Sequence, residues 1–271
     1  MNPLALFRRG LVYLMLSVAA FLSVFPFYWM IVGATNKSAD VVTGKATIGD
    51  NLLTNVASLF ATIDVPRVFF NSTFISVVAT ALTLAVSSLA GYGFEMFRSR
   101  FRDRIFGLML LLLSIPFSAL MVPLFVMISS AHLNNTWLAV ILPGISSIFI
   151  VFYFRQATKA FPTELRDAAR VDGLKEWQIF LYIYLPVMRS TYAAATIIVF
   201  LANWNNYLWP LIVLNTADNK TVTLVVSALT SSYTPDYGMI LFGTVLATLP
   251  TLIIFFALQR QFVEGLTGSV K

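Results

Sequence analysis

The sequence contains no cysteine and only one histidine, His132. It therefore forms no disulfide and offers no thiolate, and one histidine excludes a histidine-cluster metal site. Charged residues are also scarce: they make up 11% of the 271 residues, whereas a typical soluble domain has about 25%. Hydrophobic residues make up 58%, and no soluble linker or low-complexity tract is visible. This composition predicts an all-α integral membrane protein with a single domain over 1–271.

The parts of a catalytic site are missing as well. Gly44-Lys45 has no glycine five residues earlier, so it does not form a glycine-rich phosphate loop. No nucleophile–base pair and no paired carboxylates fall where a pocket would form. We therefore predict a transport subunit and not an enzyme, with no metal and no cofactor bound by this chain.

Apolar runs of the length that crosses a bilayer recur along the chain. They cover about 10–33, 69–96, 105–127, 137–154, 191–214 and 238–258. The basic start at Arg8-Arg9 is also typical of a signal peptide, but aromatic residues continue to Trp29, where a small-residue cleavage site would be needed. We predict a retained first span and six transmembrane helices in all, so both termini lie on the same side.

Lysine and arginine are distributed unequally between the two sides of this arrangement. The side with the termini carries most of the 18 basic residues, and the other side has only Lys37, Lys45, Arg67 and Lys220. By the positive-inside rule, both termini, the 98–104 loop and the 155–189 loop are cytoplasmic. The net charge of +6 thus follows from the topology and gives no indication of a nucleic-acid partner.

The apolar cores of the predicted spans contain no acidic or basic residue, and Glu95 lies at the cytoplasmic end of the second span. A secondary transporter usually carries ionisable groups at mid-membrane. Backbone and hydroxyl groups also bind sodium in some transporters. The pattern argues against a secondary transporter without excluding one.

The densest polar cluster within a span is NWNNYLWP at 203–210. At helical spacing, Asn203, Asn206 and Tyr207 share one face, and they are our candidate solute-pathway residues. Amide groups beside aromatic faces suit a neutral, hydroxyl-rich solute such as a sugar. They equally fit hydrogen bonds between helices and an interfacial aromatic belt, and both interpretations stay open here.

The longest polar interruption is the cytoplasmic stretch TELRDAARVDGLKEWQIFLYIYLP at 163–186. Thr163 after Pro162 predicts a helix N-cap, and Gly173 predicts a helix end with a positive φ. Glu164 and Asp167 then lie near the positive end of the helix dipole. An amphipathic helix leading back to the membrane follows. Small residues allow close approach and charges fix the register, so the stretch is suited to docking against another protein.

Part of this stretch, DAARVDGLKEWQIFLYIYLP, is similar to the EAA motif of ABC-importer permeases, EAAxxDGAxxxxxFxxIxLP. Asp167 replaces the glutamate and Leu174 replaces an alanine of that motif. The positions that match it fully are Ala168, Ala169, Asp172, Gly173, Phe180, Ile183, Leu185 and Pro186. The segments FPFYWM, AGYGFEMFRSR, NWNNYLWPLIVL and QRQFVEGLTGSVK resemble the maltose-type, carbohydrate-uptake branch of these binding-protein-dependent permeases.

The resemblance implies a type I ABC-importer permease fold in a bacterial or archaeal inner membrane. Such a subunit moves a solute into the cytoplasm by alternating access, and the branch implies a sugar, in particular a di- or oligosaccharide. The implied partners are a second permease subunit in a heterodimer, two cytoplasmic ATPase subunits that bind ATP and Mg, and an extracytoplasmic sugar-binding protein. A permease of the same class for a polyol or glycerol phosphate is the first alternative, and a secondary transporter is the second.

The resemblance also assigns roles within 159–189, which we call the coupling loop. It places a coupling helix at about 163–171 in a groove of the ATPase, with Asp167 nearest to that groove and Gly173 making the turn. The implied ATPase-coupling residues are Glu164, Asp167, Ala168, Ala169, Asp172 and Gly173. The loop at 215–237 resembles one that reaches into the binding protein, and the C-terminal tail resembles one that contacts the ATPase pair.

Overall fold

Every regular element in the described part of the chain is a helix, as the composition predicts. The computed structural model describes residues 3–267, and it describes the side-chain surroundings of 7–260. The chain divides into two units. Unit 1 combines Met1–Val65 with Val225–Leu249, and unit 2 combines Pro66–Leu224 with Pro250–Lys271.

Unit 1 holds the first three helices and parts of the last two. They are α1 (Pro3–Ala34), α2 (Ser38–Val42), α3 (Leu52–Thr62), the second part of α14 (Val222–Thr230) and the first part of α15 (Tyr237–Thr267). Unit 2 holds the helices between them. They are α4 (Val65–Met96), α5 (Arg100–Leu112), α6 (Phe117–Ser130), α7 (Trp137–Ile141), η1 (Leu142–Gly144), α8 (Ile148–Thr158), α9 (Thr163–Val171), α10 (Glu176–Ile179), η2 (Phe180–Tyr184), α11 (Leu185–Val187), α12 (Arg189–Trp204), α13 (Leu208–Val213) and η3 (Ala217–Asn219).

Three stretches are single helices long and apolar enough to cross a membrane: Phe7–Ala34, Val65–Met96 and Tyr237–Arg260. Three further stretches are pairs of helices bent at a short break, by 101° between α5 and α6, 44° between η1 and α8, and 81° between α11 and α12. The described residues therefore hold up to six spans if each bent pair is counted as one.

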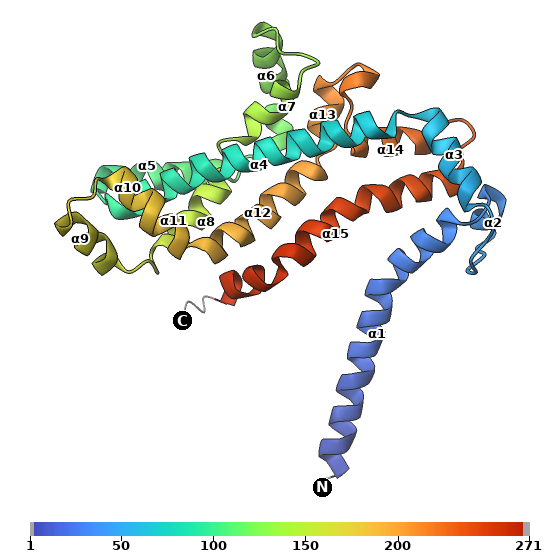
Figure 1. The fold of residues 1–271 in the computed structure, drawn as a ribbon, viewed down its shortest axis with the longest axis horizontal. Coiled ribbons are helices and arrows are strands. Elements are labelled where there is room, and N and C mark those ends of the chain that lie inside the picture. The colour runs from blue at the N-terminus through green and yellow to red at the C-terminus, as the bar shows by residue number, and fades with distance from the viewer. Residues whose placement is uncertain (1–2, 268–271) are drawn as a thin grey trace. The chain divides into compact units, whose positions relative to one another are not determined.

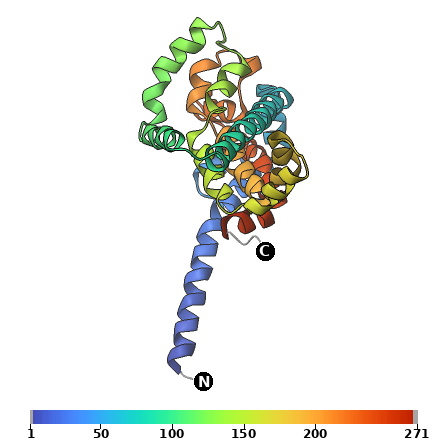
Figure 2. The same ribbon diagram turned by 90° about the vertical axis from the view of Figure 1, so that its left-hand side faces the viewer.

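The prolines explain where the bent pairs break. Pro116 stands just before α6 in an extended conformation, and it has no N–H to continue a helix from α5. We expected the span over 105–127 to be broken by Pro116 and Pro123. The chain does change direction sharply next to Pro116, between α5 and α6 (Figure 2), whereas α6 continues through Pro123. Pro143 lies within η1, and Pro186 lies within α11, shortly before the third bend. Pro26 and Pro250 remain inside long helices, as membrane helices permit.

A buried asparagine holds unit 1 together where α1 ends. Asn55 of α3 is 1% exposed, and its amide nitrogen donates to the carbonyl oxygens of Ala34 and Asn36 at 2.8 and 2.9 Å. Ser38 donates to the Asp236 carboxylate at 2.6 Å, which ties α2 to the start of α15. By contrast, none of the most apolar window of α1 is buried inside the structure, so this surface is suited to lipid or a partner helix.

Three apolar clusters of the described residues pack along α4 in unit 2, and two of them position the regions discussed below. The first joins α4 to α6, α7 and α13 around Trp209, whose indole N–H donates to the Ala139 carbonyl at 2.8 Å. The second contains Tyr92, Phe161, Phe180, Tyr184 and Met188. It underlies α9 and α10, which lie at the C-terminal end of α4 (Figure 1). The coupling loop is thus built on the same long helix as the first cluster.

Candidate functional site

The first helix of the coupling loop is α9. The sequence predicts its place correctly, but the predicted N-cap at Thr163 would start the helix one residue too late. Pro162 occupies the N-cap position in an extended conformation, Thr163 is the first helical residue, and no side chain caps this end. The expected Thr163 cap is therefore wrong. Proline needs no N–H partner before the first turn and already has the φ that a helix start requires, so it starts the helix by itself.

The end of α9 follows the prediction closely. Gly173 has a φ of +83°, as expected for the residue after a helix. Its N–H donates to the Arg170 carbonyl, and the Leu174 N–H donates to the Ala169 carbonyl, each at 3.0 Å. These two bonds form a Schellman motif, which satisfies carbonyls that the helix end would leave free. The turn between α9 and α10 is therefore fixed by backbone geometry.

The predicted coupling residues do not all lie on one face of α9. Glu164, Asp167, Ala168 and Asp172 are exposed. Ala169 is 4% exposed and faces inward. Val171 is 88% exposed, so the outer face combines carboxylates with an apolar side chain. Such a face is typical of a docking surface, because an exposed apolar residue on a charged helix gains by being covered.

The inner face of α9 is held by ion pairs. The Arg166 side chain, 10% exposed, donates from Nε and Nη2 to Glu176 of α10 at 3.2 and 3.1 Å. The Arg170 Nε donates to the same carboxylate at 2.7 Å. The Tyr92 hydroxyl of α4 donates to it at 3.1 Å. One carboxylate therefore joins three helices.

The surroundings of Glu176 shift its protonation equilibrium. Partial burial raises the pKa of the carboxyl, but hydrogen bonds from Arg166 and Arg170 and the positive charge of Arg166 outweigh this, so the pKa lies below its ordinary value. Glu176 is therefore ionised at neutral pH and accepts all of these bonds.

The second half of the coupling loop is less regular than the sequence predicts. We expected one amphipathic helix up to Pro186, whereas the chain forms α10, the π-helical turn η2 and then α11. Phe180 and Tyr184 belong to the second apolar cluster described above, while Trp177 and Leu181 are 57% and 46% exposed. The hydroxyls of Tyr184 and Thr158 share a hydrogen bond of 2.6 Å, which ties η2 to α8.

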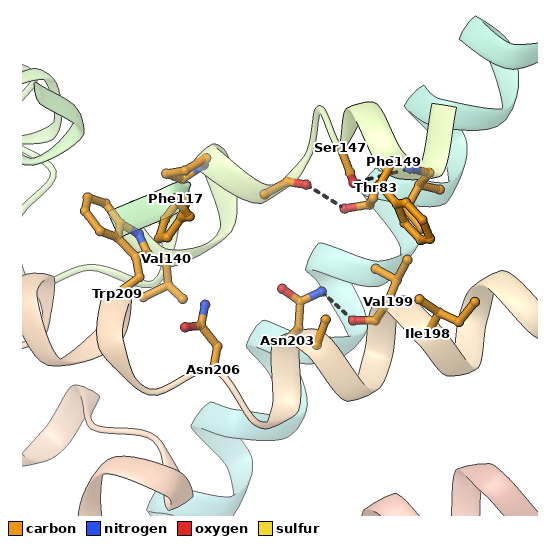
Figure 3. Close-up of a pocket in the computed structure, with 14 residues that line it drawn as sticks. Thr83, Phe117, Val140, Ser147, Phe149, Ile198, Val199, Asn203, Asn206 and Trp209 are labelled. Atoms are coloured by element: carbon orange, nitrogen blue, oxygen red, sulfur yellow. Dashed lines mark hydrogen bonds between the residues drawn. The ribbon is translucent and has the colours of Figure 1, made fainter. Parts of the chain in front are cut away.

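A cavity of about 350 Å³ lies further along unit 2. Its lining comes from α4, α6, α7, η1, α8, α12 and the segment that follows it: Thr83, Phe117, Val140, Pro143, Gly144, Ser147, Phe149, Ile150, Ile198, Val199, Ala202, Asn203, Asn206 and Trp209. Figure 3 shows amide, hydroxyl and aromatic groups around this space. None of the described residues that line it carries a charge.

Two of the three candidate solute-pathway residues line the cavity. The Asn203 amide nitrogen donates to the Val199 carbonyl at 2.9 Å, and the Asn206 side chain points toward the cavity (Figure 3). Tyr207 does not line it and packs against the cluster around Trp209. The expected continuous helix is also wrong here, because α12 ends at Trp204 and α13 begins at Leu208. Asn206 reaches the cavity from this break and not from a helical face.

Comparison with known proteins decides the family. The model of the family "Binding-protein-dependent transport system inner membrane component" matches residues 84–268, which include the coupling loop and most of the cavity lining. The chain belongs to this family. The predicted resemblance to this family is thereby confirmed. The prediction of a multi-pass membrane protein that serves as a transport subunit is confirmed as well.

Several named relatives of this permease cover nearly its whole length. The lactose transport system permease protein LacG of Rhizobium radiobacter is 65% identical over 259 residues, which is 96% of this chain and 95% of that protein. The arabinooligosaccharides permease AraQ of Halalkalibacterium halodurans is 38% identical, over 93% of this chain and 92% of its own. The sn-glycerol-3-phosphate permease UgpE of Agrobacterium fabrum is 27% identical, over 97% of both.

A solved structure has the same fold. A chain from a bacterial ABC transporter involved in the import of the acidic polysaccharide alginate matches with a TM-score of 0.84, covering 97% of this chain and 99% of that one. Its sequence identity is 17%, so the match shows the fold alone. The predicted all-α permease fold is confirmed.

Sequence reasoning missed several residues of this permease that the structure brings together. Arg166 and Glu176 pair across the Gly173 turn, and no helical spacing connects them because they lie on different helices. Tyr92 joins them from a distant part of the chain. Thr83 and Ser147 line the cavity beside the asparagines, yet single hydroxyl residues are common in membrane helices and give little signal.

Proposed function

We propose that this chain is one permease subunit of an ATP-driven importer that moves a neutral sugar, a di- or oligosaccharide, into the cytoplasm by alternating access. The observation that carries the proposal is the 65% identity to a lactose permease over nearly the full length of both chains. The second sugar permease, at 38% identity, supports the same class of solute.

The chemistry of the cavity favours a neutral solute over a charged one. Asn203, Asn206 and Ser147 offer amide and hydroxyl groups, which suit the hydroxyls of a sugar. Phe117 and Phe149 are 45% and 49% exposed and offer apolar faces to a sugar ring. A phosphate ester would lose its hydration without gaining a cationic partner from the described lining. This argues against glycerol phosphate, although a 27% identical relative is named for it.

The outer face of α9 is the proposed docking surface for a cytoplasmic ATPase. Glu164, Asp167, Ala168 and Asp172 would face the ATPase groove, while Gly173 makes the turn and the buried Ala169 supports it from within. ATP and Mg would be bound by two separate ATPase subunits, and this chain would hold no cofactor. A second permease subunit would complete the pathway as a heterodimer.

The proposed topology places the coupling loop and both termini in the cytoplasm of a bacterial or archaeal cell, because most basic residues lie on that side. The 215–237 loop would then meet an extracytoplasmic sugar-binding protein. The C-terminal tail is expected to contact the ATPase pair, and its last residues, 268–271, lie outside the described part of the chain.

Reconstitution tests the proposal. The chain is co-purified with its partner permease, ATPase and binding protein and placed in proteoliposomes, and uptake of lactose, an arabinooligosaccharide and sn-glycerol 3-phosphate is followed with and without ATP. We expect ATP-dependent uptake of a neutral sugar that requires the binding protein. Uptake by this chain alone would establish a secondary transporter, and uptake of the phosphate ester alone would overturn the assignment to sugars.

A further inference from the structure

One carboxylate contributes to the attachment of the coupling helix α9 to the membrane helix α4. Glu176 accepts hydrogen bonds from Arg166 and Arg170 of α9 and from Tyr92 of α4. It belongs to neither helix, since it is the first residue of α10. A carboxylate has enough acceptor sites for this set of donors, and bonds to ionised groups are stronger than neutral ones.

Arg166 strengthens the same attachment from the other side. Its guanidinium lies 4.8 Å from the centre of the Phe97 ring, which directly follows α4. Arg166 also donates to the carbonyl of Met96, the last residue of α4, at 3.5 Å. Arg102 lies 5.6 Å from the same Phe97 ring. The C-terminal end of α4 is therefore held by Arg166 directly and by Glu176 through Tyr92.

The attached end of α4 leads directly to the cavity. Thr83 lines the cavity and lies nine residues before Tyr92 on the same unbroken helix. At 1.5 Å per residue, this separation is about 14 Å along the axis. A movement of α9 that carries the end of α4 with it would therefore reach the cavity wall without crossing a loop.

We propose that Glu176 is a positioning residue that locks the coupling helix to α4, so that movement imposed on α9 reaches the cavity. The proposal rests on the proposed function, because it takes α9 as the surface that an ATPase moves. Glu176 touches no solute in this scheme. Without its carboxylate, α9 would be held to α4 only by the contacts of Arg166 with Met96 and Phe97, and more ATP would be hydrolysed for each solute moved.

The test uses the complete importer in proteoliposomes and measures solute imported per ATP hydrolysed. Glu176→Gln keeps the size of the side chain and removes its charge. Tyr92→Phe removes only the link to α4 and leaves the pairs between α9 and α10. We expect Glu176→Gln to lower the ratio at least about fivefold, the lower end of measured coupling between sites. Tyr92→Phe should lower it less, because Arg166 still contacts Met96 and Phe97.

The matched control is Asp40→Asn, which removes the same charge from an exposed pair with Lys45. Glu176→Asp keeps the charge and should recover part of the lost ratio. A merely structural role would lower the amount of assembled importer and leave the ratio per ATP unchanged. A wild-type ratio in Glu176→Gln, or in Tyr92→Phe combined with Arg166→Lys, contradicts the locking role. Failure of the wild-type importer to couple uptake to ATP contradicts the proposed function instead.

Discussion

Arg155 of α8 and Glu95 of α4 form an ion pair of 3.3 Å in which both side chains are less than a tenth exposed. Arg155 also pairs with Asp103 of α5, and its guanidinium lies 4.1 Å from the centre of the Phe106 ring. Burial of charge is costly, so such a group needs partners on every side. This guanidinium joins three helices at the same end of unit 2 as the coupling loop.

Replacing Arg155 with methionine should destabilise the protein strongly. The change removes the buried partner of Glu95 and leaves this carboxylate with only the exposed Arg98, and breaking a buried pair costs about 3–5 kcal/mol. Thermal unfolding of the detergent-purified importer measures the loss. Arg98→Ala is the control, because Arg98 pairs with the same Glu95 at 3.5 Å but is 57% exposed. An exposed partner contributes about 0–1 kcal/mol. Equal losses of stability in the two variants would contradict the role of Arg155 as the buried partner of Glu95.

Gly173→Val should uncouple ATP hydrolysis from transport. At a φ of +83°, a β-branched residue is strained, at a cost of roughly 1–2 kcal/mol. A Cβ added at Gly173 meets nothing within 4 Å, so the effect would come from the backbone and not from a clash. The ratio of solute imported to ATP hydrolysed should fall while the subunit still inserts in the membrane.

Two variants control for the Gly173 prediction. Gly173→Asn should be tolerated better, because asparagine adopts left-handed backbone more readily. Gly44 has a φ of +81°, and a Cβ added there also meets nothing within 4 Å, but this glycine lies outside the coupling loop. Gly44→Val therefore imposes the same strain and should leave coupling intact. Wild-type coupling in Gly173→Val would show that the turn geometry is dispensable.

Asn206→Ala should weaken solute transport without changing ATPase docking. Loss of one hydrogen bond to a sugar hydroxyl costs about 1 kcal/mol, which corresponds to about a fivefold lower transport efficiency. Uptake kinetics measure the change, and co-purification of the ATPase measures docking. Asn205→Ala is the matched control, since Asn205 is exposed and does not line the cavity. Unchanged uptake in Asn206→Ala would favour a role in packing between helices.

The coupling loop should be insensitive to pH until the solution becomes strongly acidic. The pKa of Glu176 is lowered in the folded protein, with Arg166, Arg170 and Tyr92 facing the carboxylate. Its stabilising contribution is therefore full above the ordinary glutamate pKa of about 4.3 and is lost as the pH falls through the lowered folded value.

Hydrogen exchange of the α9 amides, corrected for intrinsic rates, measures this dependence. Protection should stay constant from neutral pH down to about 5 and decrease only below the ordinary pKa. Glu176→Gln should remove the decrease, because glutamine does not titrate. Loss of protection near neutral pH in the wild type would contradict the role given to Glu176.

The sequence predicted those features that depend on local chemistry. The end of α9 at Gly173 follows from the freedom of glycine at positive φ, and the run of apolar segments follows from composition. It failed where distant residues decide the conformation. The break at Asn205–Tyr207 contains no proline or glycine itself, and its local signal is Pro210, whose ring would clash with the Asn206 carbonyl in a continuous helix. The link from Tyr92 to Glu176 depends on how helices pack, which no spacing in the sequence encodes.

The helix α4 differs from the other predicted spans because it has no proline within its interior. Its only proline, Pro66, is the second residue of a helix of 32 residues, whereas each other predicted span contains a proline within its run. A helix of this length measures about 48 Å. Lacking a hinge, it cannot absorb a displacement by bending and must turn or slide as one stiff rod. A displacement at the end of α4 next to α9 would therefore be carried along the whole length of the helix.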